Sequence, residues 1–74
     1  MVNAVLLDLE KKETYVGSYD EEYYKKNIMG GKRDDEHPTS IFEYRKDAIR
    51  EAKRVAKMST TKHETWTYNE SRNK

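Results

Sequence analysis

The chain opens with two short runs in which apolar and polar residues alternate. Every second residue from Val5 to Leu9 is apolar, a pattern that predicts a β-strand over residues 2–10 with one buried face. Leu6 breaks the alternation, so we expect this strand to be covered on both faces near its start. Residues 14–19 form a second strand-like run, and two such runs joined by a few polar residues predict an antiparallel hairpin.

The middle of the chain is ambiguous between helix and strand. Ser18 and Glu21 match the Ser-x-x-Glu capping box of a helix N-terminus, whereas the tyrosines of residues 18–30 also suit a strand; we favour a short helix or turn. Residues 30–40, GGKRDDEHPTS, combine paired glycines, consecutive charges and the single proline, which predicts a loop. We expect residues 30–38 to be the most mobile interior segment.

A helix over residues 45–58 is the strongest local prediction. Its apolar residues recur at three- and four-residue spacings and form one stripe, made of Ala48, Ile49, Ala52, Val55 and Ala56. Residues 40–44 suit either a short strand or the entry to this helix, with Ser40 and Glu43 as a second capping box. Residues 63–70 alternate again and predict the last strand. The core expected from these faces contains Val5, Leu7, Val16, Phe42, Ile49, Ala52, Val55 and Trp66.

The order of these elements predicts a single α+β domain over residues 1–70. A small antiparallel β-sheet would be packed by one main amphipathic helix, and residues 71–74 would form a frayed tail. With 34% hydrophobic and 39% charged residues, a chain of 74 residues has a thin core. Binding to a partner, or to a second copy in a homo-oligomer, is one way to bury more surface.

Composition also limits the setting and the chemistry. The absence of cysteine excludes disulfides and thiolate zinc sites and favours an intracellular, cytoplasmic protein. The longest apolar run, residues 4–7, is far shorter than the ~20 residues of a membrane span, so we expect no membrane association. No phosphate loop or nucleophile elbow is present, and His37 beside three acidic residues is more typical of a surface than of a metal site. We therefore expect no enzymatic activity, no catalytic residue, no cofactor and no metal.

The outer face of the predicted helix is rich in cations. Its basic residues fall on one side of the helix and include Lys46, Arg50, Lys53, Arg54 and Lys57. Such a row could contact the phosphates of a nucleic acid. Because the net charge is only +1, we favour a solvated face and keep nucleic-acid binding as the alternative function.

Tyrosines and acidic clusters supply the other candidate surface. Six tyrosines in 74 residues is a high proportion, and tyrosine combines apolar area with a polar tip in the way that binding hot spots do. Two acidic clusters, at residues 20–22 and 34–36, would make the surface charge uneven, and such a surface steers a charged partner. The candidate partner-binding residues are Tyr19, Asp20, Glu21, Glu22, Tyr23, Tyr24, Asp34, Asp35 and Glu36. The partner that they predict is a protein.

The segment FEYRKDAIREAKRVA, residues 42–56, is followed by a strand that carries Thr and Trp. In this it resembles the helix-to-last-strand half of many tiny bacterial and bacteriophage proteins, some of which bind and inhibit a host enzyme. The resemblance implies a small intracellular binder without chemistry of its own, and it assigns no role to any single residue. We therefore predict a non-catalytic protein-binding module, acting as a regulator or inhibitor of a larger host macromolecular machine.

Overall fold

The computed structural model describes all residues from Met1 to Lys74. Its elements are β1 (Val2–Asp8), β2 (Glu13–Tyr19), α1 (Glu21–Asn27), β3 (His37–Phe42), α2 (Arg45–Ser59), β4 (Thr67–Tyr68) and a 3₁₀ helix, η1 (Glu70–Arg72). The four strands form one sheet in the order β3-β1-β2-β4. The α+β class is confirmed, but the sheet is mixed: β1 is antiparallel to β2 and β3, whereas β4 runs parallel to β2.

Helix α2 packs on one face of the sheet through its alanines. Ala48 and Ala52 are fully buried against Val5 and Val16, and Thr14 Oγ1 donates a hydrogen bond to the carbonyl oxygen of Ala52 at 2.7 Å. This close approach requires side chains no larger than a methyl group on the helix. Of the expected core, Val5, Val16 and Ala52 are buried, whereas Leu7, Phe42, Ile49, Val55 and Trp66 are only half-buried.

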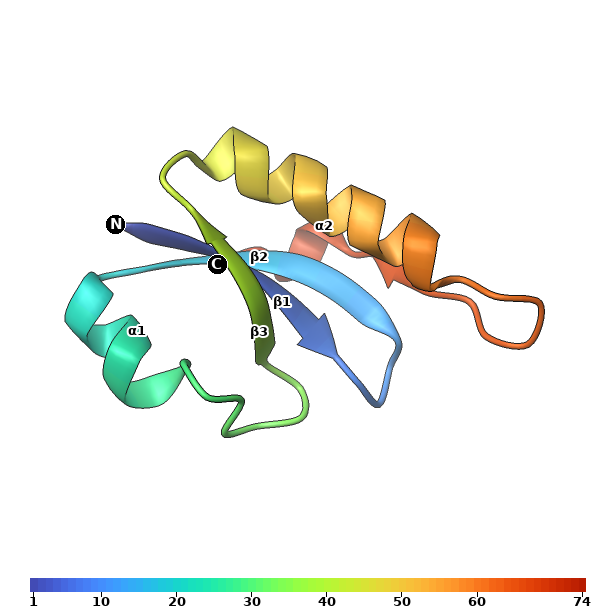
Figure 1. Ribbon diagram of the computed structural model, residues 1–74, viewed down its shortest axis with the longest axis horizontal. Coiled ribbons are helices and arrows are strands. Elements are labelled where there is room, and N and C mark those ends of the chain that lie inside the picture. Colours follow the sequence, from blue (N-terminus) through green and yellow to red (C-terminus); the bar gives the residue numbers. More distant parts are fainter.

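The opposite face of the sheet carries a second core, none of whose members was in the expected core. Its buried residues are Ala4, Leu6, Tyr15, Tyr19, Tyr24 and Ile28. Helix α1 lies on this side of the sheet and α2 on the other (Figure 1). The expectation drawn from Leu6 is confirmed, because β1 is buried on both faces over most of its length.

The middle of the chain is a helix, but neither predicted capping box forms. Helix α1 begins at Glu21, and its N-cap Asp20 makes no side-chain hydrogen bond; Ser18 Oγ instead donates to Asn3 Oδ1 at 2.6 Å. Helix α2 begins at Arg45, after a residue that likewise makes no side-chain cap. The predicted loop is shorter than expected, because its last residues pair with β1 from His37 onward.

The final segment is also different from the expectation. The last strand is only two residues long, Thr67–Tyr68. The tail at 71–74 is not frayed: Lys74 N–H donates to the carbonyl oxygen of Val16 at 2.9 Å, and Ser18 N–H donates to that of Lys74 at 3.1 Å. The tail docks because the outer backbone groups of β2 would otherwise have no partner.

Candidate functional site

The two edges of the sheet differ in whether other residues cover their outer backbone groups. The outer edge of β2 is closed by β4 and by the residues that follow it: Asn69 N–H donates to Thr14 O at 2.8 Å, and the Asn73 side chain accepts from Val16 N–H at 2.7 Å. At the other edge, β3 has β1 as its single neighbour. An edge strand presents unpaired backbone N–H and C=O groups, so the sheet offers further pairing only along β3.

Half of the β3 edge is protected and half is open. Pro38 removes a backbone donor near the start of the strand, and the register with β1 shifts between Val5 and Leu6, which leaves Thr39 as a bulge. Proline and bulges are devices that block strand addition. Beyond them, residues 40–42 pair regularly with β1 and carry no charged side chain. Ile41 is 55% exposed, so the open half presents both backbone and apolar surface.

A groove lies at this open end of β3. It has a volume of about 390 Å³ and is lined by residues from the start of β1, the N-terminus of α1 and the end of β3: Met1, Val2, Glu21, Ile41, Phe42 and Glu43. Four of these residues are apolar, and the two charged side chains are carboxylates. The open edge of residues 40–42 and this groove together are called the β3 edge site below. A second, smaller hollow of about 250 Å³ lies between Phe42 and the charged residues of α2.

The predicted tyrosines do not form one exposed surface. Tyr19 and Tyr24 belong to the core, and burial is the main cause that raises the pKa of both phenols. Of the three candidate tyrosines only Tyr23 is exposed, with its ring stacked on that of Tyr19 at 5.7 Å between centroids. The strand and helix patterns show which tyrosines share a face, but not that this face lies under α1.

The two acidic clusters also have different surroundings. Glu21 and Glu22 are exposed on α1, and Glu21 lines the groove of the β3 edge site. In the second cluster, Asp35 forms a bidentate ion pair with Arg33, with oxygen–nitrogen distances of 2.9 and 2.8 Å. Glu36 accepts from Tyr19 Oη at 3.1 Å and pairs with Lys74. Asp20 and Asp34 are exposed. Of the predicted acidic residues, Asp20, Glu22 and Asp34 are exposed without an ion-pair partner, whereas Glu21 pairs with Lys25 at 3.2 Å.

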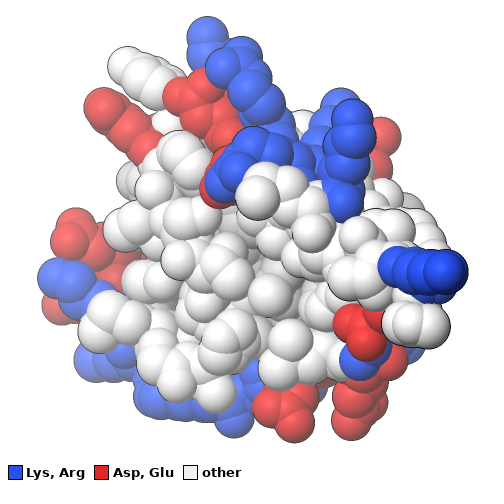
Figure 2. Space-filling view, turned by 45° about the vertical axis from the view of Figure 1, so that its right-hand side comes forward, with Lys and Arg blue, Asp and Glu red and all other residues white.

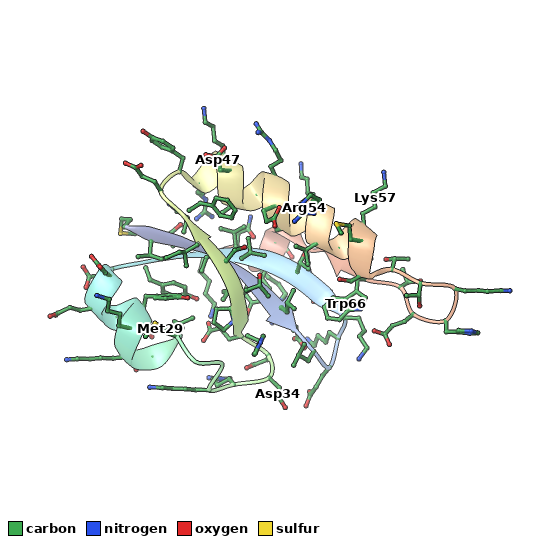
Figure 3. All side chains as sticks on the ribbon, in the orientation of Figure 1. Met29, Asp34, Asp47, Arg54, Lys57 and Trp66 are labelled. Atoms are coloured by element: carbon green, nitrogen blue, oxygen red, sulfur yellow. The ribbon has the colours of Figure 1, made fainter.

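The basic row on α2 is a solvent-facing surface. Lys46, Arg50, Lys53 and Lys57 are exposed, and none of them forms an ion pair. Arg54 differs, because it is paired with Glu51: its Nε and Nη2 each donate a hydrogen bond of 2.6 Å to the Glu51 carboxylate. Lysine and arginine side chains gather over α2, above a broad face with few charges (Figure 2). Lys57 projects away from the sheet, on the side opposite Met29 and Asp34 (Figure 3).

A buried charge cluster was missed by the sequence analysis. Arg72 Nη1 lies 2.8 Å from both Asp8 Oδ2 and Glu13 Oε1, and its guanidinium carbon lies 4.4 Å from the centre of the Tyr15 ring. Burial raises the pKa of Asp8, but hydrogen bonds from Lys11 N–H, Arg72 and Glu10 N–H outweigh it and hold that pKa below its ordinary value. Neither hollow is lined by this cluster, which joins the end of β1, the start of β2 and the 3₁₀ helix η1.

Comparison with protein-family models, with curated proteins and with solved structures gives no match to this chain. No group of three or more metal-ligating side chains lies close enough to hold an ion. Neither helix has the length and apolar character needed to cross a lipid bilayer. The surface features described above are therefore the basis for a functional proposal.

Proposed function

We propose that the protein is a non-catalytic protein-binding module that accepts an extended segment of a partner protein at the β3 edge site. The observation that carries this proposal is the asymmetry of the sheet, in which one edge is closed by the chain itself and the other is open at residues 40–42. Strand addition obtains affinity from main-chain hydrogen bonds and specificity from pockets beside alternate side chains. The open edge and the groove supply both.

Exposed apolar side chains surround the same place. Met1 and Ile41 line the groove, and Tyr44 lies two residues after the end of β3; their exposed fractions are 81%, 55% and 59%. Aromatic residues and methionine are enriched in protein interfaces. A module of this kind has the properties of a regulator or inhibitor, because it can occupy a strand of a larger assembly without performing chemistry.

A pull-down from a lysate of the source cell, compared between matched variants, tests the proposal. Ile41→Lys places a charge on the open edge, and Lys53→Gln changes an exposed residue of α2 that lies outside the site. A partner retained by the wild type and by Lys53→Gln, but lost with Ile41→Lys, is the expected result, with circular dichroism confirming that both variants fold. Equal retention by all three proteins would contradict the proposal.

Nucleic-acid binding through α2 is the second candidate, supported by the four exposed cations without ion-pair partners. The test is fluorescence anisotropy with labelled DNA and RNA over a range of salt concentrations. Each phosphate neutralised on duplex DNA contributes a slope of about −0.9 in log affinity against log salt. Replacing Lys46, Arg50, Lys53 and Lys57 with glutamine should remove that slope if the row binds phosphates, and should change nothing if the row is only solvated.

A further inference from the structure

We infer that the partner segment at the β3 edge site is a strand with lysine or arginine at every second position and apolar residues between them. This inference rests on the proposed function and specifies the chemistry of the partner. The groove beside residues 40–42 is lined by four apolar residues and by Glu21 and Glu43, and no lysine or arginine side chain of this chain lines it. A site with apolar walls and a carboxylate rim fits the stem and the charged head of a basic side chain.

The carboxylates of the groove are available to a partner. Glu43 is exposed and forms no ion pair, and its backbone carbonyl is held by the Asn3 side chain at 2.9 Å, which fixes its position. Glu21 pairs with Lys25 at 3.2 Å, but both side chains are largely exposed, so this pair is weak and exchangeable. Glu22 is exposed beside it and also unpaired.

Strand geometry decides which side chains of the partner would meet these carboxylates. Ile41 pairs with Ala4, which belongs to the core on the α1 side of the sheet. Directly opposed residues of paired strands point to the same face, so Ile41 lies on the α1 side with Glu21. Every second residue of an added strand would point to this side. Basic side chains at those positions can lie along Ile41 and reach the α1 carboxylates.

A second copy of this chain fits the site less well. The β3 strand itself, HPTSIF, contains no lysine or arginine. Antiparallel pairing of two β3 edges would also bring the exposed Glu43 of each copy to a site that is already acidic, and like charges across an interface oppose association. Charge therefore favours a different protein with a basic strand.

Three synthetic nonapeptides test the inference. The first alternates valine and arginine, the second replaces every arginine with glutamate, and the third has the first sequence with N-methylation at alternate backbone nitrogens. Affinities and sites are measured by titration of ¹⁵N-labelled protein followed by NMR. The basic peptide is expected to shift the amides of residues 39–43 and to bind at least about tenfold more tightly than the acidic one. N-methylation is expected to abolish binding, because it removes donors while keeping the charges.

Protein variants complete the test. The double variant Glu21→Gln with Glu43→Gln is expected to weaken the basic peptide about three- to tenfold, whereas Asp34→Asn, an exposed carboxylate outside the groove, should not. Equal affinity for the basic and acidic peptides at the β3 amides would overturn the basic preference and leave the proposed function standing. Absence of all peptide binding, binding that survives N-methylation, or a dimer in which only β3 amides shift would overturn the inference; the first two of these outcomes also count against strand addition itself.

Discussion

Arg72 holds the end of the chain against the end of the first strand through Asp8, with 2.8 Å between Nη1 and Oδ2. The two residues are 64 positions apart in the sequence. The Asp8 side chain is 3% exposed and that of Arg72 25%, so this ion pair is shielded from water. The same carboxylate accepts the backbone N–H groups of Glu10 and Lys11, so Asp8 joins the β1–β2 turn to the final segment.

Removal of one partner should be strongly destabilising. We expect Arg72→Gln to lower the free energy of unfolding by ~3 kcal/mol, because Asp8 remains buried and keeps its two backbone hydrogen bonds but loses its only cationic partner. Chemical denaturation measures the change. The control is Arg54→Gln, which breaks the exposed pair with Glu51 and should leave stability almost unchanged. Similar losses for the two variants would show that burial of the Asp8 pair has no special weight.

Stability should fall in acid because of Asp8. Its pKa in the folded protein lies below the ordinary value of 3.8, so around that pH the unfolded chain binds more protons than the folded one. The stabilisation is therefore complete above about pH 4–5 and is lost as pH falls through the folded pKa. Between pH 2 and 6, the melting temperature should change less steeply with pH for Asp8→Asn than for the wild type.

The stability of Asp8→Asn should still depend on pH to some extent. The pKa of Asp35 is lowered chiefly by a hydrogen bond from Arg33, and the pKa of Glu51 chiefly by one from Arg54. Both groups act in the same direction as Asp8. An unchanged slope in Asp8→Asn would mean that these surface carboxylates, and not the buried one, govern the acid transition.

Gly17 should resist substitution because the Tyr19 ring covers it. A Cβ at position 17 would lie 2.5 Å from Tyr19 Oη and 2.6 Å from a ring carbon, so the ring would have to move and its hydrogen bond to Glu36 would be lost. We expect Gly17→Ala to cost about 1–3 kcal/mol. In a double-mutant cycle with Tyr19→Ala, most of this cost should disappear. Additive effects would show that the clash with Tyr19 is not the cause.

The second core should be as important as the first. Leu6 is fully buried on the α1 side, and we expect Leu6→Ala to cost ~2–5 kcal/mol in the free energy of unfolding. The neighbouring Leu7→Ala removes the same atoms from a half-buried position on the other face and should cost clearly less. Equal losses in urea denaturation would contradict the burial of the α1 side.

Local patterns were enough to predict the elements that stand on their own periodicity. The alanine stripe of α2 and the alternation of β1 identify a helix and a strand without reference to any other segment, and both are present. That Tyr15 and Tyr19 lie on the same face of the sheet could also be predicted, since residues four apart in a strand point to one side. What covers that face depends on Tyr24 and Ile28, which belong to a helix too short for a clear periodic signal.

The parts that could not be predicted depend on distant partners. Nothing local in residues 71–74 indicates order. Their order comes from distant residues, since Asp8 holds Arg72 and Val16 holds Asn73. His37 and Pro38 resemble a loop in sequence, and they join a strand only because β1 lies beside them. For the candidate site, the acidic residues of α1 were identified from their charge. The open edge of β3 was not, since an edge is defined by the order of strands and not by the composition of one.

The docked tail has a consequence for the way the protein is made. The β1–β2 hairpin is complete after residue 19, but the bonds that close the outer edge of β2 reach it from residues 69–74, up to 58 positions later in the chain, as in the bond between Lys74 N–H and Val16 O. Until those residues have been synthesised, the nascent hairpin has two exposed edges and lacks the arginine that neutralises Asp8. Neighbouring nascent chains on one messenger RNA could then pair with each other through β2. This hazard ends when each chain docks its own last residues on β2.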